Sequence, residues 1–224
     1  MGQAIGQILP IAVGVALSPL PIIAVVLMLT TPRARTNGLS FVLGWLAGLG
    51  VIGALVLVVA GPAGASEHGA PATWVSWLKV LLGVLLLVWA VQQFRGRPRE
   101  GDEVETPAWL GAIERFTAGK SIGVGALLSG ANPKNTVLAI GAAATIAQTG
   151  IPGVQQAITY AVFAVIGTLG VGAPVVMYYT MGKRSTDVLA ALKDWMNRHN
   201  AVIMSVLCLV VGTKLIGDAI SALA

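Results

Sequence analysis

A polar break interrupts an apolar segment at residues 129–135, which read Ser-Gly-Ala-Asn-Pro-Lys-Asn. A second break lies about half a chain earlier, at residues 16–21, Ala-Leu-Ser-Pro-Leu-Pro. Each break places a helix-capping residue directly before a proline, as Ser18-Pro19 and Asn132-Pro133. Serine and asparagine are preferred N-caps, and proline is favoured at the first helical position. We therefore expect each segment to contain two half-helices, the second of which begins at the proline.

The composition places the chain in the class of membrane proteins. Its 224 residues are 56% hydrophobic and 10% charged, and the mean hydropathy is +0.83. Apolar runs of about 20 residues recur along it, which is the length that crosses a hydrocarbon core. The formal net charge of +5 is typical of basic cytoplasmic loops and does not indicate nucleic-acid binding. A single cysteine excludes an intrachain disulfide.

The hydrophobic runs predict an all-α, polytopic integral membrane protein with six transmembrane helices. The expected spans are residues 7–30, 38–60, 74–94, 121–146, 154–179 and 201–223. Three spans in each half give the halves opposite orientations, so the chain is expected to form two inverted three-helix repeats with broken helices 1 and 4. Residues 1–224 then form a single transmembrane domain, with repeat one at 1–94, a cytoplasmic linker at 95–120 and repeat two at 121–224.

Three further features concern packing and the membrane surface. Gly44, Gly48, Gly50 and Gly53 lie close together in the second span, and small residues let helix backbones approach closely in lipid. A short amphipathic helix is expected after Pro107, with Trp109, Leu110, Ile113 and Phe116 on one face. A second one is expected within residues 183–200, with Val188, Leu189, Leu192, Trp195 and Met196 on one face.

The distribution of basic residues predicts the orientation. The loops after spans one, three and five carry nearly all of the Lys and Arg residues, and the loops after spans two and four carry none. The positive-inside rule therefore places the odd-numbered loops in the cytoplasm and both termini outside. The resulting expectation is a multi-pass protein of the bacterial inner (plasma) membrane.

The two breaks are the expected binding site. Broken helices at membrane depth must face protein or water, and half-helix N-termini favour anions. Lys134 adds a positive charge in the first turn after the second break. The candidate substrate-binding residues are Ser18, Pro19, Pro21, Asn132, Pro133, Lys134 and Asn135. The alternative is a purely structural role, in which the prolines only kink the helices for packing.

Three other ionisable residues fall inside the expected spans, Lys79, Lys214 and Asp218. Charges at such depth often line a pathway. Both lysines could instead extend towards the membrane surface, and Lys214 and Asp218, four residues apart, could form a simple structural pair. Three intramembrane lysines against one aspartate disfavour a metal-cation site. No catalytic cluster, metal site or cofactor motif is evident, so we expect a protein that is not an enzyme.

The chain resembles the LysE superfamily of exporters. Six spans in two inverted halves, a proline-broken first span and Asn132-Pro133-Lys134 in the fourth carry this resemblance. The small-residue-rich spans and polar linker are similar to the GAP branch, the (peptido)glycolipid- or sulfolipid-addressing proteins. That resemblance implies export or flipping of a cell-envelope lipid. Leu20 replaces the glycine that amino-acid exporters carry between the two prolines, which disfavours an amino-acid substrate.

The expected function is an inner-membrane transporter that exports or flips an anionic cell-envelope (glyco)lipid. Its partners are then membrane lipids and an anionic lipid or small-molecule substrate, with no nucleic acid. The alternatives are an exporter of a small solute such as an amino acid, and a non-transporting accessory subunit of a lipid-export machine. A homodimer and a larger lipid-export machinery are both compatible with the sequence.

The topology gives a first prediction. A cysteine introduced as Glu100→Cys in a Cys208→Ser background, in the predicted cytoplasmic linker, should stay unlabelled when intact cells are treated with a membrane-impermeant maleimide. It should react after the cells are permeabilised. Labelling of intact cells would contradict the predicted orientation.

Overall fold

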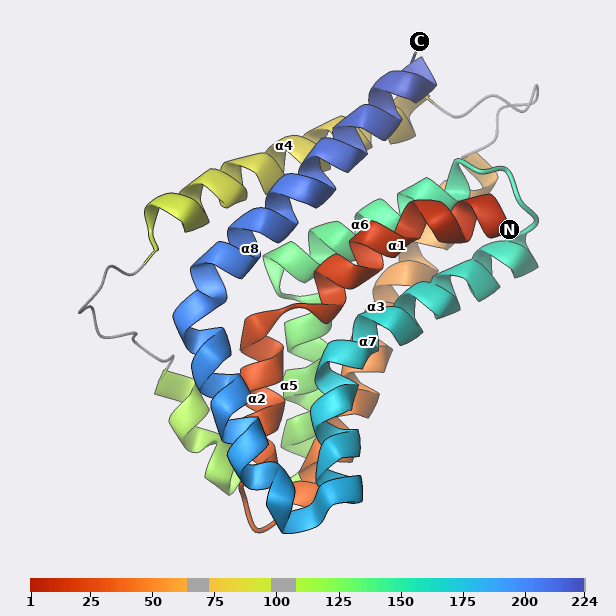
Figure 1. Ribbon diagram of the computed structural model, residues 1–224. Coiled ribbons are helices and arrows are strands. Elements are labelled where there is room, and N and C mark those ends of the chain that lie inside the picture. Colours follow the sequence, from red (N-terminus) through yellow and green to blue (C-terminus); the bar gives the residue numbers. More distant parts are fainter. Residues whose placement is uncertain (64–72, 98–107, 224) are drawn as a thin grey trace.

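The computed structural model describes residues 1–63, 73–97 and 108–223, and these residues are almost entirely helical (Figure 1). The expected linker residues 98–107, including Pro107, and the loop at 64–72 lie outside the described residues. The α-helices are α1 (Gly2–Ala16), α2 (Pro19–Leu29), α3 (Ala34–Ala63), α4 (Thr73–Arg95), α5 (Ala118–Gly130), α6 (Pro133–Ala147), α7 (Gly153–Met181) and α8 (Ser185–Leu223). Two 3-10 helices, η1 (Ala108–Arg115) and η2 (Gly182–Arg184), accompany them.

Both predicted breaks are present, and after each break the new helix begins at the proline that follows the capping residue. Helix α1 stops at Ala16 and α2 begins at Pro19, with a bend of 52° between them. Helix α5 stops at Gly130 and α6 begins at Pro133. The cap residues Ser18 and Asn132 both have extended backbone, which proline imposes on the residue that precedes it.

Up to five membrane spans are supported by length and hydropathy in the described part of the chain. Helices α3, α4, α7 and α8 qualify singly, and the bent α1–α2 pair qualifies as one span. The α5–α6 pair, expected as the fourth of six spans, does not meet the same criterion. Its halves have 13 and 15 residues, and each is too short to cross a hydrocarbon core alone.

Two predicted surface helices take a different form. The segment expected as a separate amphipathic helix within residues 183–200 is the start of α8, which runs unbroken for 39 residues into the expected sixth span. No glycine or proline occurs between Ser185 and Val211, so nothing in the sequence ends the helix there. The other segment is the 3-10 helix η1, whose Leu110 and Ile113 are buried.

Small residues bring the helices together around the breaks. A Cβ atom on Gly44 or Gly48 of α3 would overlap α5, at Ile122 and at Ser129. A Cβ atom on Gly170 of α7 would overlap the carbonyl oxygen of Ala16, at the end of α1. Gly53 contacts Tyr160 of α7 in the same way, whereas Gly50 faces open space. Packing therefore explains Gly44, Gly48 and Gly53, but not Gly50.

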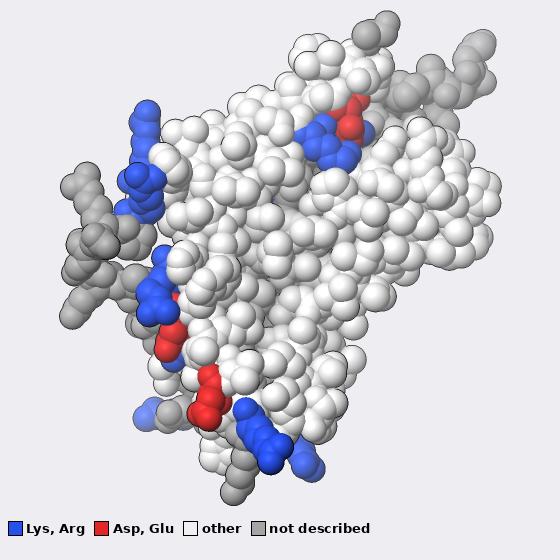
Figure 2. Space-filling view, in the orientation of Figure 1, with Lys and Arg blue, Asp and Glu red and all other residues white. Residues whose placement is uncertain are grey.

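Charged side chains at the surface gather in separate regions. Figure 2 shows Lys and Arg along the left edge and the lower end, and one further group of mixed charge near the upper right. A broad uncharged surface separates these regions in this view. Many large apolar side chains are exposed elsewhere along the helices as well, such as Leu55, Val58 and Leu169. An apolar band between two charged ends is the surface expected of a protein embedded in a bilayer.

The glycine contacts give a second prediction. Gly44→Ala should lower the free energy of unfolding by about 1–3 kcal/mol, because the added methyl group overlaps the backbone of α5. Gly50→Ala on the same helix should be neutral or stabilising by up to about 1 kcal/mol, since nothing lies within reach of its Cβ. Thermal unfolding of both purified variants in detergent tests this, and equal melting temperatures would contradict the proposed packing.

Candidate binding site at the two helix breaks

The two breaks contact each other through Lys134 and Ser18. The Lys134 Nζ donates to the Ser18 Oγ at 2.7 Å and to the backbone carbonyl of Gly14 at 2.9 Å. Gly14 lies in the last turn of α1, where the break leaves carbonyl groups without a helical N–H partner. The lysine thus satisfies a carbonyl that the first break exposes. It also places a cation at the helix C-terminus, the end that favours positive charge.

Asn135 ties the second break to the first. The Ser18 hydroxyl donates to the Asn135 Oδ1 at 2.9 Å, and the Asn135 Nδ2 donates to the carbonyl of Leu128 at 2.9 Å. Thr136 donates to the carbonyl of Gly130 at 2.7 Å, and the Asn132 Oδ1 accepts from the Lys134 backbone N–H at 3.2 Å. Side chains of one short segment, residues 132–136, therefore cap both breaks.

A cavity of about 320 Å³ opens beside this junction. Its walls come from both breaks and from α4 and α8, which pack side by side (Figure 1). No Asp or Glu is among the described residues that line it. We call it the break cavity, and it is lined by Ser18, Pro19, Leu20, Pro21, Trp89, Gln93, Asn132, Pro133, Lys134, Asn200, Met204 and Cys208.

The structure brings most of the predicted site residues to this cavity. Six of the seven predicted break residues line it, and the seventh, Asn135, lies behind them and holds Ser18. Sequence reasoning missed the opposite wall, formed by Trp89 and Gln93 of α4 and by residues of α8. Gln93 and Asn200, polar residues close to the ends of expected spans, were the available signal.

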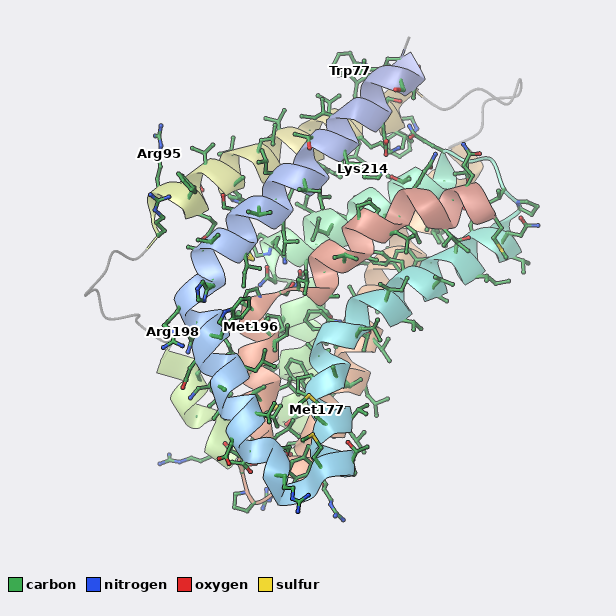
Figure 3. All side chains as sticks on the ribbon, viewed as in Figure 1. Trp77, Arg95, Met177, Met196, Arg198 and Lys214 are labelled. Carbon is green, nitrogen blue, oxygen red and sulfur yellow. The ribbon has the colours of Figure 1, made fainter. Side chains whose placement is uncertain are left out.

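The three predicted pathway residues lie elsewhere. Lys79 and Asp218 line a second cavity of about 390 Å³, together with Gln3, Gln7, Gln148, Thr149, Ser221 and Ala222. The Lys214 Nζ donates to the Asp218 Oδ2, so the i, i+4 pair expected from the sequence is formed. In Figure 3, Lys214 lies towards the Trp77 end of α4 and away from Arg95. We call this second space the glutamine cavity.

Lys79 is buried within the molecule. Only 3% of the residue is exposed, and among the described residues no hydrogen bond or salt bridge holds its ammonium group. Its side chain lines the glutamine cavity instead of the outer surface of the molecule.

These features together define an α-helical membrane protein with a cationic, partly polar cavity between two helix breaks. The whole chain but its ends, residues 8–221, matches the family model described as Sap, sulfolipid-1-addressing protein. The chain therefore belongs to the sulfolipid-1-addressing protein family, as the similarity to the lipid-addressing GAP branch implied. No curated protein and no solved structure matches the chain.

The bonds at the breaks give a third prediction. Asn135→Ala should lower the free energy of unfolding by about 1–3 kcal/mol, because it leaves the partly buried Leu128 carbonyl without its donor and the buried Ser18 hydroxyl without its acceptor. Asn200→Ala is the matched control, since Asn200 is an exposed residue of the cavity wall and should change stability by less than about 0.5 kcal/mol. Chemical or thermal unfolding of both variants makes the comparison, and equal stabilities would show that Asn135 does not support the junction.

Proposed function

We propose that this protein moves an anionic cell-envelope lipid across the membrane and that the break cavity binds the lipid's head group. The observation that carries the proposal is the position of the Lys134 Nζ. It lies where the two breaks meet, in a cavity whose described lining holds no carboxylate. A cation that no acidic group neutralises attracts an anion, and a charge-assisted hydrogen bond then forms away from bulk water. The family's description as sulfolipid-addressing supports a lipid that carries a negative group.

The helix ends contribute less to anion binding than the lysine does. Pro19 and Pro21 have no N–H group, and the N–H of Ile22 bonds to the carbonyl of Ser18 at 3.4 Å. Only Leu20 can therefore offer a free backbone donor in that turn. The Lys134 N–H is already held by Asn132. Recognition of the head group is then assigned mainly to the Lys134 ammonium group, with Gln93 and Asn200 as neutral polar partners in the same cavity.

Part of the helix packing supports an inverted-repeat transport mechanism. If α1 is matched with α5, α2 with α6, α3 with α7 and α4 with α8, the α1–α7 contact corresponds to α5–α3, α2–α3 to α6–α7 and α2–α8 to α6–α4. These contacts all occur, whereas the counterparts of the α1–α6 and α1–α8 contacts, α5–α2 and α5–α4, have no comparable contact. Inverted repeats with broken helices at their centre are typical of transporters that open alternately to each side.

The orientation completes the proposal. Basic residues lie at the left edge and the lower end in Figure 2, and Arg95 and Arg198 mark the left edge in Figure 3. The positive-inside rule assigns this side to the cytoplasm. In this proposal the α5–α6 pair forms a sixth, broken crossing of the membrane. The break cavity reaches Gln93, two residues before Arg95. The lipid therefore enters from the cytoplasmic side and leaves towards the outer face of the inner membrane.

Loss of the Lys134 charge gives the fourth prediction. In proteoliposomes, movement of a fluorescent phosphatidylglycerol between leaflets should fall roughly 10- to 150-fold in Lys134→Met, the effect of about 1.5–3 kcal/mol from one charged hydrogen bond. Lys134→Arg should restore part of the rate. Lys120→Met, which removes an exposed lysine at the start of α5, should leave the rate unchanged.

A second readout separates binding from folding. Cys208 is the chain's one cysteine and lines the break cavity, so its reaction with a maleimide reports occupancy directly. A short-chain phosphatidylglycerol should slow this reaction in the wild-type chain and in Asn135→Ala, but not in Lys134→Met. If the lipid moves at the wild-type rate in folded Lys134→Met, the break cavity is not the binding site. If purified protein moves no lipid although Cys208 is protected, the protein assists another transporter.

A further inference from the structure

The glutamine cavity and the break cavity are lined by residues at matching positions of α4 and α8, counted from the point where these two helices cross. These two helices cross at Gly83 and Gly212, where a Cβ atom on either glycine would lie 2.9 Å or 3.0 Å from the other's carbonyl oxygen. Lys79 lies four residues before Gly83, and Cys208 lies four residues before Gly212. Each of these two residues lines its own cavity. The two cavities therefore occupy equivalent places on opposite sides of one helix crossing.

Two more pairs of lining residues follow the same register. Trp89 lies six residues after Gly83, and Asp218 lies six residues after Gly212. Gln93 and Ala222 follow their glycines by ten residues each. Trp89 and Gln93 line the break cavity, while Asp218 and Ala222 line the glutamine cavity. The α4–α8 walls of the two cavities are therefore equivalent in register. Their other walls differ, since the breaks line one cavity, and the start of α1 and the end of α6 line the other.

A thin apolar layer separates the two spaces. Gly14 of α1 lies against Leu138 and Val211, with a Cβ atom there 3.4 Å and 3.3 Å from their methyl groups, and Gly141 lies against Leu215. Cys208 and Asp218 are ten residues apart on α8, which corresponds to about 15 Å along a helix. That distance is short enough for one lipid head group to pass from one cavity to the other if the layer parts.

The chemistry of the glutamine cavity suits an anionic group surrounded by hydroxyls. Lys214 and Asp218 neutralise each other as a salt bridge, so the ammonium group of Lys79 is the charge left over in the described lining. Gln3, Gln7, Thr149 and Ser221 add amide and hydroxyl groups that both donate and accept hydrogen bonds. A sulfate or phosphate ester on a hydroxyl-bearing head group would match one cation with neutral polar groups around it.

We propose that the glutamine cavity is a second binding site for the anionic, hydroxyl-bearing head group of the transported lipid, with Lys79 as its cationic partner. This inference rests on the proposed function, and it makes the glutamine cavity the last site that the lipid occupies before release. A free inorganic anion shares the charge but lacks the hydroxyls and the chains, so the two ligands can be told apart by experiment.

The test uses one reporter cysteine in each cavity. Cys208 reports the break cavity in the wild-type chain, and Ser221→Cys in a Cys208→Ser background reports the glutamine cavity. The full-length protein in nanodiscs of phosphatidylcholine is treated with a maleimide in the presence of a sulfated dodecyl glucoside, the unsulfated dodecyl glucoside or sodium sulfate. The sulfated amphiphile should slow labelling at position 221 about tenfold, the effect of one charged hydrogen bond, and the other two compounds should not.

Substitutions assign the protection to Lys79. Lys79→Met should abolish the protection at position 221, whereas Lys134→Met should retain it. If Lys79→Met does not yield folded protein, Gln7→Glu serves instead, because a carboxylate in the cavity competes for Lys79 and should also abolish protection. Lys120→Met is the control and should behave like the parent chain.

Three results would overturn the proposal while leaving the break site intact. They are protection of Cys208 without protection at position 221, equal protection at position 221 by sodium sulfate, and protection that survives both Lys79→Met and Gln7→Glu. Absence of protection at both reporter cysteines would count against the proposed function as well.

Discussion

The hydrogen bond from Lys134 to the carbonyl of Gly14 connects the two halves of the molecule at membrane depth. A break in a membrane helix exposes backbone carbonyl groups that lipid cannot satisfy. The second break is capped by its own residues, Asn135 and Thr136. The first break depends on donors from the other half, because Pro19 and Pro21 supply none. The junction is therefore both a structural requirement of the fold and the origin of the charge in the break cavity.

Lys134 both bonds the first break and charges the break cavity, and this limits where a cation can be placed there. Lys134 follows Pro133 directly, and the residue at the same place after the first break is Leu20. Both line the break cavity. A second lysine at position 20 would place two cations in one desolvated space, at a high cost in free energy. Lys134 therefore supplies the one cation among the described residues that line the break cavity, which suits a ligand with one negative group.

The sequence predicts those parts of the structure that local chemistry determines. Ser18-Pro19 and Asn132-Pro133 define the breaks because capping and proline geometry act within a few residues. Gly44 and Gly48 mark a close packing face because small residues at helical spacing let another helix approach, although the sequence does not say which helix. The partner of Lys134 was not predictable, since a backbone carbonyl such as that of Gly14 carries no signal in the sequence. The cavity wall from α4 and α8 was missed because it depends on a crossing between residues far apart in the chain.

The continuous helix α8 explains why the site has that wall at all. A separate surface helix followed by a span would need a turn near His199 and Asn200, and such a turn would move Met204 and Cys208 relative to the breaks. Because no residue there ends the helix, α8 runs past the break cavity, the Gly83–Gly212 crossing and the glutamine cavity as one rigid element. A tilt of α8 against α4 about that crossing would narrow one cavity as it widens the other. The two glycines let the helix backbones approach closely at this pivot, with the side chains of Leu86, Leu87 and Ile216 packed around it.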